Sequence, residues 1–304
     1  MARHVPWISV ALFAVALMAT SPDARTPTAT LALGGDVHFG RWSGDTYRPT
    51  PPPATDEELR RRFTAADLAL INLETAICHH DEARASDPLF ADQVNRFTAE
   101  PPALDWLVDL GVDAAIVANN HALDCGPDSL THTVTHLDER RIVAAGLGPP
   151  AELTIGDHPV LVLAITAHPP RINPGDHPSP KILWNRTASR RALLSRVEDL
   201  RADHPDALII VSLHWGEELA AEPSPDQRRL AHGLLDAGAD LLYGHGPHVV
   251  QEVEHSGPGA IVYSAGNLRF DMRHPDTLTP GLIEIDLFRV DPSPSGSPWK
   301  VRAR

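Results

Sequence analysis

Side chains that can bind metals recur at one kind of position in this sequence, directly after a short apolar run. Five such runs occur, and the residues that follow them are Asp36 and His38, Asn72 and Glu74, Asn119, Asn120, His121 and Asp124, His214, and His245 and His248. Short apolar runs between helical patterns predict buried strands. Because the carboxyl ends of the strands in an open α/β sheet meet at one crevice, we expect these side chains to surround a single point.

The chemistry of this set suits divalent cations. Carboxylate, amide and imidazole groups are ligands for Mn, Fe, Zn or Mg, and the sequence does not distinguish these metals. The candidate ligands are Asp36, His38, Glu74, Asn120, His214, His245 and His248. This set is too large for one tetrahedral ion. We therefore expect two metal ions bridged by a carboxylate, an arrangement that suits hydrolysis. His121 is not needed as a ligand and could donate a proton to the leaving group.

Each element also has a plainer explanation. Asn119 and Asn120 could be turn residues, and His214 could be a core histidine. His245 and His248 could simply occupy a glycine-rich loop. The coincidence of five strand ends favours the metal site over these separate explanations.

The elements that must position these residues alternate along the chain. Apolar runs predict strands over residues 30–35, 68–72, 114–118, 142–145, 160–166, 207–213 and 241–243. Helical patterns lie between them over residues 56–66, 101–110, 128–140, 187–203 and 225–237, and Thr55 with Glu58 predicts a capping box before the first helix. This order predicts an α/β fold with a mainly parallel sheet. The segments 249–253, 260–264 and 282–290 predict further strands in a mixed or antiparallel second sheet, so we expect a sheet-on-sheet core flanked by helices.

Composition narrows the classes of function. The 304 residues carry a net charge of −14 and contain no run of five or more basic residues, which argues against a nucleic-acid-binding surface. The sequence also lacks the glycine-rich ATP-binding segment that a polymer-forming ligase would need.

The two ends of the chain differ from its centre. A basic start followed by an apolar run over residues 5–19 predicts a secretory signal within residues 1–27, with an uncleaved membrane anchor as the alternative. Residues 28–290 are expected to form one domain, and residues 291–304 a loose tail. Cys78 and Cys125 each follow a predicted strand, so their sulfurs could approach if those strands are neighbours; a disulfide and two free thiols both stay open.

Taken in order, these motifs resemble the CapA family of poly-γ-glutamate capsule synthesis proteins, which is similar to the calcineurin-like metallophosphoesterases. The matching segments are Gly35-Asp36 through Gly40-Arg41, Asn72-Leu73-Glu74, Ala118 to Gly126, His214-Trp215-Gly216, Gly244 to His248, and Tyr263 to Asn267. The resemblance implies a metallophosphatase-like β-sandwich of mixed sheets flanked by helices. It implies that Asp36 and His38 bind metal, that Glu74 bridges two ions and that Asn120 and His121 are a ligand and an acid. His214, His245 and His248 resemble later histidine ligands, and Arg41 and Asp124 join His121 as catalytic candidates.

The function that follows is an exported or membrane-anchored metal-dependent hydrolase of capsule biosynthesis, located outside the cell or at the outer face of the cytoplasmic membrane. Its expected substrate is a small phosphoester or an anionic polymer with poly-γ-glutamate or peptide-like amide bonds. Two alternatives remain. One is a non-catalytic component of a capsule synthesis or export complex, and the other is a metal-dependent peptide epimerase.

Overall fold

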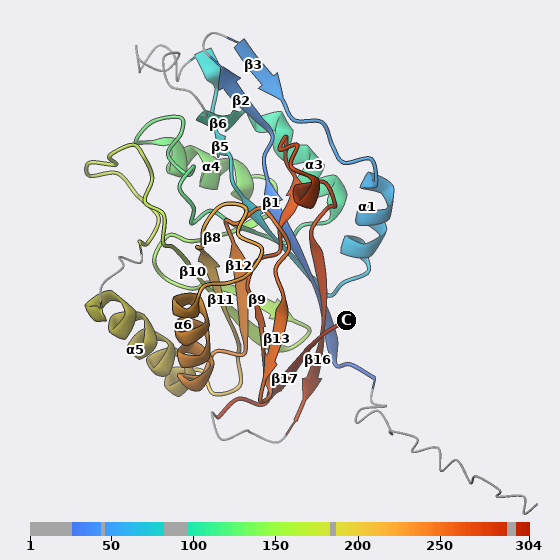
Figure 1. The fold of residues 1–304 in the computed structure, drawn as a ribbon, viewed down its shortest axis with the longest axis vertical. Helices are drawn as coiled ribbons and strands as arrows, with labels where there is room; N and C mark the ends of the chain where they lie inside the picture. The colour runs from blue at the N-terminus through green and yellow to red at the C-terminus, as the bar shows by residue number, and fades with distance from the viewer. Residues whose placement is uncertain (1–25, 44–45, 82–95, 183–186, 291–295) are drawn as a thin grey trace, which may run out of the picture.

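The computed structural model describes residues 26–43, 46–81, 96–182, 187–290 and 296–304. Two large mixed sheets pack face to face with helices outside them (Figure 1). The first sheet has the order β17 (Trp299–Ala303), β16 (Leu282–Arg289), β1 (Ala29–Val37), β4 (Leu68–Leu73), β7 (Ala114–Ile116) and β8 (Val143–Ala145), with β15 (Asn267–Arg269) beside β1. The second has the order β13 (Val253–Ser256), β14 (Gly259–Val262), β12 (Leu241–His245), β11 (Leu208–His214), β10 (His158–Thr166) and β9 (Ala151–Ile155). The predicted α/β sandwich of mixed sheets is thus confirmed.

A third, small sheet lies at the top of the view in Figure 1. Its order is β3 (Thr46–Pro49), β2 (Gly40–Ser43), β6 (Arg96–Ala99) and β5 (Ala76–Ile77). The elements predicted from the sequence include no strand at β6. Arg96 and Thr98 are buried although they are polar, so the apolar pattern that announces a strand is missing there.

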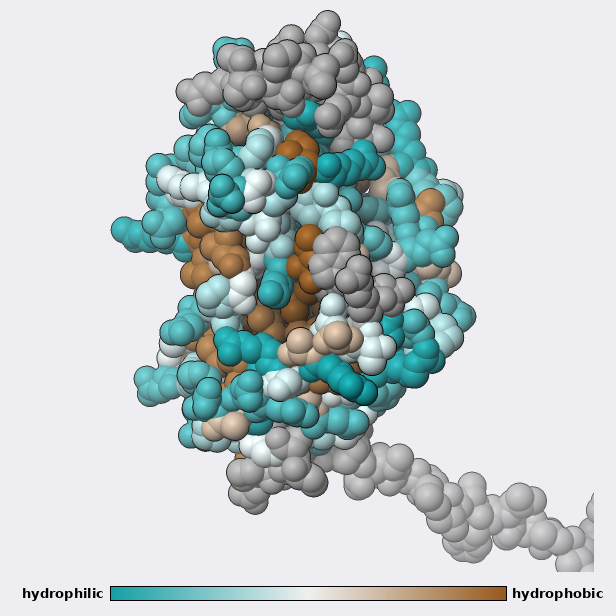
Figure 2. Space-filling model, turned by 90° about the vertical axis from the view of Figure 1, so that its left-hand side faces the viewer, coloured by the Kyte–Doolittle hydropathy of each residue, from teal (hydrophilic) through white to brown (hydrophobic). Residues whose placement is uncertain are grey.

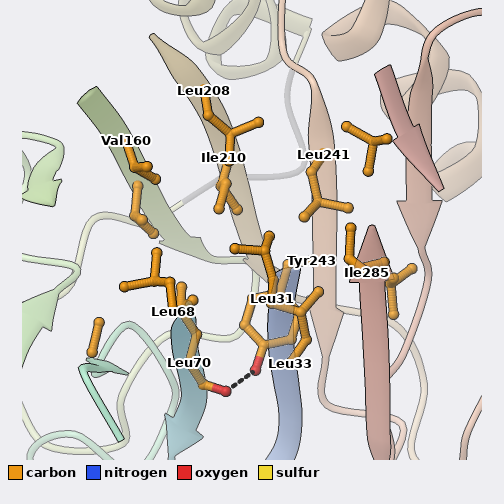
Figure 3. Packing of buried hydrophobic residues seen from close by; sticks show 14 of the residues in the cluster. Leu31, Leu33, Leu68, Leu70, Val160, Leu208, Ile210, Leu241, Tyr243 and Ile285 are labelled. Carbon is orange, nitrogen blue, oxygen red and sulfur yellow. Dashed lines mark hydrogen bonds between the residues drawn. The ribbon is translucent and has the colours of Figure 1, made fainter. Parts of the chain in front are cut away.

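The main core lies between the two large sheets. Alternate residues of the central strands point into it, as Leu31 and Leu33 of β1 and Leu208 and Ile210 of β11 do (Figure 3). The Tyr243 hydroxyl donates to the carbonyl oxygen of Leu70 at 3.2 Å and also to that of Gly34, so one phenol joins the two sheets through the apolar layer.

Helices cover the outer faces of both sheets. The first sheet is covered by α1 (Asp56–Thr64), the short helix η2 (Pro101–Leu104), α3 (Asp105–Leu110) and α4 (Ser129–Asp138). The second is covered by α5 (Thr187–Asp203) and α6 (Pro225–Asp236), and a short helix η3 (Pro275–Thr277) precedes β16. Because the strands are buried on both faces, they read as near-continuous apolar runs. On the side that carries α5 the surface is mainly hydrophilic with apolar patches between (Figure 2).

The predictions about the last third of the chain are correct only in part. As predicted, β13 and β14 lie in the mixed second sheet, whereas β16 pairs with β1 in the first. The strand expected over 249–253 begins only at Val253. The tail expected to be loose over 291–304 ends in β17, which pairs with β16 and buries Trp299.

The predicted export segment falls almost wholly on residues 1–25, which lie outside the described residues. Within the described chain, no helix is both long enough and apolar enough to cross a membrane.

Candidate metal centre

Parallel pairing brings the carboxyl ends of the central strands to one edge. β1, β4 and β7 are parallel neighbours in the first sheet, and β11 and β12 are parallel neighbours in the second. The register sets Asp36 beside Asn72 and His214 beside His245. The convergence that the sequence predicts is therefore a consequence of strand direction and register.

Three side chains form the centre of this cluster. Asp36, Glu74 and His214 each offer one ligand atom, and these atoms lie within 4.8 Å of one another. All three residues are buried. Two more imidazoles contact Asp36: Nδ1 of His245 lies 3.4 Å from Oδ1, and Nδ1 of His248 lies 3.0 Å from Oδ2. The second sheet thus supplies imidazoles to carboxylates from the first.

Several polar atoms of the cluster are buried without a hydrogen-bond partner. They are Oε2 of Glu74, Oδ1 of Asn120 and Nε2 of His245, together with Oδ2 of Asp36 and Nδ1 of His245, which have ion-pair contacts but no hydrogen bond. Leaving a buried polar atom unpaired costs about 1–3 kcal/mol, and more for a charged group, so a group of them in one place indicates a missing partner. Oxygen and imidazole donors of this kind fit divalent cations such as Mn, Fe, Zn or Mg.

Two asparagines hold the candidate site residues in place through hydrogen bonds. Asn72 Nδ2 donates to Oδ1 of Asp36 at 2.8 Å. Asn119 Nδ2 donates to the carbonyl oxygen of Leu73 at 2.9 Å, and Oδ1 of Asn119 accepts from the backbone N–H of His121 at 3.1 Å. These bonds tie the loops after β4 and β7 together and fix the positions of Asp36 and His121, as outer partners do in metal sites.

The two carboxylates differ in their electrostatics. Burial would raise the pKa of Asp36, but the imidazoles of His245 and His248 hold it well below its usual value. Burial raises the pKa of Glu74 well above its usual value, which the charge of Asp36 reinforces. Burial lowers the pKa of His248, but Glu74 and Asp36 outweigh it and raise that pKa to about 10. Burial lowers the pKa of His214, so that imidazole is neutral, as a metal ligand must be.

A cleft of about 470 Å³ opens over the centre. Glu74, Asn120, His121, His214 and His248 all line it. The cations beside it are Arg41 and Arg171, and the apolar part of its wall is formed by Phe97, Phe270 and Met272. A substrate in this cleft would meet the carboxylates, the imidazoles and two guanidinium groups together.

His121 is held in one orientation on the wall of the cleft. Its Nδ1 lies 2.6 Å from Oδ2 of Asp124, and its Nε2 lies 3.8 Å from Oε1 of Glu74. The same Oδ2 of Asp124 accepts from the backbone N–H of Phe97 at 2.7 Å, and the Phe97 ring stacks on the imidazole with centroids 3.7 Å apart. Nδ1 therefore faces the carboxylate, and Nε2 is the atom that faces the centre.

Two of the sequence candidates sit apart from the central group. Nδ1 of His38 lies 2.8 Å from the Thr50 hydroxyl, and the ring packs against those of Phe97 and Phe270. Burial lowers the pKa of His38, and Nε2 has no hydrogen-bond partner. Arg41 forms an ion pair with Asp271 and lies over the Phe97 ring at 4.6 Å.

Sequence reasoning missed several contributors. It gave no role to Phe97, whose strand it did not predict, or to Asn267, whose Oδ1 accepts from Nδ1 of His248 at 2.9 Å. The sequence did not decide whether Cys78 and Cys125 are bonded. In the structure they form a disulfide, with Cα atoms 6.3 Å apart.

The fold and the site define an α/β sandwich protein with a buried carboxylate–imidazole centre at one edge of both sheets. The chain belongs to the bacterial capsule synthesis protein family PGA_cap, whose sequence profile matches residues 30–272. The family resemblance inferred from the motifs is thereby confirmed.

Relatives of known name agree with this family. The chain is 25% identical over 296 residues to the PGA biosynthesis protein CapA of Bacillus subtilis, covering 93% of this chain and 75% of that protein. It is 25% identical over 274 residues to the capsule biosynthesis protein CapA of Bacillus anthracis, covering 85% and 64%. Among solved structures, a phosphatase from Mycoplasma pneumoniae is 12% identical, with a TM-score of 0.48 over 79% of this chain and 73% of that one.

Proposed function

We propose that this protein is an exported metal-dependent hydrolase of capsule synthesis that acts on a phosphoester or on a γ-glutamyl or peptide-like amide. The observation that carries the proposal is the group of buried ligand atoms without hydrogen bonds on Asp36, Glu74, Asn120 and His245 below an open cleft. The relatives named for PGA and capsule biosynthesis support the anionic polymer as one of the two substrate classes.

Within this proposal Asp36, Glu74, Asn120, His214 and His245 hold the metal, and His248 lies beside it. A bound pair of divalent cations would supply polarisation of the scissile group and activation of water. Nε2 of His121 gives a proton to the leaving group, while Asp124 holds Nδ1 and so keeps the ring in place. Arg41 and Arg171 face the anionic groups of the substrate. Phe97 and Phe270 exclude water from one side of the cleft.

Export is the second part of the proposal. The disulfide supports it, because disulfides persist in oxidising compartments outside the cytoplasm. Cell fractionation tests it directly: we expect the protein outside the cytoplasm or at the membrane. Full-length protein with reduced cysteines in the cytosol would contradict export.

Activity is tested by loading metal-free protein with Mn, Fe, Zn or Mg and assaying aryl phosphoesters and γ-glutamyl amides. We expect metal-dependent turnover of one of the two classes. The matched control is Asp36→Asn, which keeps the size of the side chain and removes its charge. Equal turnover by both proteins, or none by either with any metal, would contradict the proposed hydrolase.

A further inference from the structure

The disulfide lies next to the proposed acid in both sequence and space. Cys125 directly follows Asp124, the carboxylate that contacts Nδ1 of His121. Its partner Cys78 is the residue directly after β5. The Cys78 N–H donates to the carbonyl oxygen of Ala99 in β6 at 3.0 Å. The cross-link therefore connects the loop that carries the acid to the small sheet.

That same small sheet supplies the other contacts of the acid. β6 carries Phe97, whose N–H donates to Asp124 at 2.7 Å and whose ring stacks on His121. Nη1 of Arg96 donates to the carbonyl oxygen of Asp124 at 3.1 Å. The orientation of the His121–Asp124 pair therefore depends on how the small sheet packs against the loop that carries the pair.

The cross-link is one of several attachments of the small sheet, because Ile77 and Ala99 are buried in the core cluster of the loop and the Ile77 N–H donates to the Thr133 hydroxyl at 2.9 Å. The apolar cluster there consists of Trp42, Ala76 and the two cysteines, with Tyr47 partly buried against it. The loop itself is also anchored, because Ala122 and Leu123 are buried in the core beneath α4 and the hydroxyl of Ser129 donates to the carbonyl oxygen of Ala122. Without the cross-link the loop would stay folded, and its alignment with β6 would loosen.

Most of the proposed metal ligands lie away from this cross-link. Asp36 belongs to β1, Glu74 directly follows β4, and His214 and His245 end β11 and β12 in the large sheets. Asn120 is in the cross-linked loop, but beside Ala122 and Leu123, whose burial in the core anchors that part of the loop. Loss of the disulfide should therefore disturb the acid and spare the ligands.

We propose that the Cys78–Cys125 disulfide is a positioning element that aligns the His121–Asp124 pair with the reacting centre. The inference rests on the proposed function, since it assigns the pair a role in hydrolysis. It goes beyond that function by making full activity depend on oxidation of two cysteines that touch neither metal nor substrate.

The test removes the cross-link in the full chain with Cys78→Ala/Cys125→Ala, and with the serine pair as a second variant. We expect unchanged metal content and turnover lowered by about 10- to 100-fold for a substrate with a poor leaving group. An activated nitrophenyl substrate, which needs no proton, should be turned over almost as well as by the unchanged protein. Placed on His121→Ala, the cysteine substitutions should cause no further loss.

Leu234→Ala is the matched control, because it truncates the core beneath α6 on the outer face of the other sheet. It lowers stability without touching the acid and should show no dependence on the leaving group. An equal loss on both substrates by the cysteine variants, a further loss on His121→Ala, or no loss at all would overturn the inference.

A second readout does not need activity. Nitrogen-15 NMR of the imidazoles, with His121→Gln to assign the signal, should show an Nδ1–H of His121 that is protected from exchange in the disulfide-bonded protein and exposed in both cysteine variants. Identical protection in all three proteins would refute the positioning role. If this signal changes while no substrate is turned over by any of them, the proposed hydrolysis fails and the positioning stands.

Discussion

Nδ1 of His248 lies 3.0 Å from Oδ2 of Asp36 and 4.0 Å from Oε2 of Glu74. One imidazole thus faces both carboxylates of the centre, in a buried setting that raises its pKa to about 10. In the metal-free protein the protonated His248 therefore balances negative charge at the carboxylates. A bound divalent ion would do the same.

Metal binding should therefore release protons. At pH 7.5 the metal-free protein holds a proton on His248, and the pKa of Glu74 is also raised well above its usual value. A divalent cation disfavours both protons, so the affinity should rise with pH up to about 10. Calorimetry in buffers of different ionisation enthalpy measures the number released, and we expect about one or more. His248→Gln should release fewer, and equal release by the two proteins would contradict this role of His248.

Glu74→Gln should separate metal affinity from stability. Because the folded-state pKa of Glu74 is raised, its ionisation costs stability above the unfolded value of about 4.5, and the neutral amide removes that cost. We expect metal content to fall sharply while the melting temperature of the chelator-treated protein stays level or rises. Glu252→Gln, at an exposed carboxylate paired with Arg228, is the control and should change neither quantity. A lower melting temperature of metal-free Glu74→Gln would count against the electrostatic account.

The helices show which local signals are reliable. The sequence predicts a helix over 187–203, and α5 has those bounds. It also predicts a capping box at Thr55, yet the side chain of Thr55 makes no capping bond, because its backbone (ψ 21°) is not extended as a cap requires. Ser224 is extended, with ψ 158°, and forms a capping box with Gln227. Residue type alone therefore indicates a cap without guaranteeing one.

The site was easier to predict than the strand partners. Asp36, Glu74 and His214 follow apolar strands, and parallel pairing alone brings such ends together. The partner of β16 is β1, about 250 residues earlier, and no local pattern encodes that choice. The disulfide could be predicted only on a condition. The sequence allowed the sulfurs of Cys78 and Cys125 to meet if the strands before them were neighbours, and β4 and β7 are neighbours.

A buried ion pair offers a stability test away from the site. Arg201 Nη2 lies 2.7 Å from Oδ2 of Asp240, and both side chains are buried. Arg201→Met leaves the buried Asp240 without its cation and should lower the free energy of unfolding by about 3–5 kcal/mol. The control is Arg61→Met, which breaks an exposed pair with Glu58 and should have little effect, since such pairs contribute little. Chemical denaturation measures both, and similar losses in the two variants would contradict the argument.

The last prediction separates ligand from acid on adjacent residues. Asn120 has a buried side-chain oxygen without a partner, whereas His121 has one nitrogen held by Asp124 and the other facing Glu74. Asn120→Ala should therefore lower metal occupancy, measured by elemental analysis. His121→Ala should keep the metal and slow turnover by about 10²- to 10⁴-fold, most strongly for poor leaving groups, because those need the proton in the transition state. Asp124→Asn should reproduce a part of that loss, since an amide can still hold Nδ1 but does not favour the protonated ring. If His121→Ala instead empties the centre, His121 is a ligand, and His248 becomes the residue to substitute next in the search for the acid.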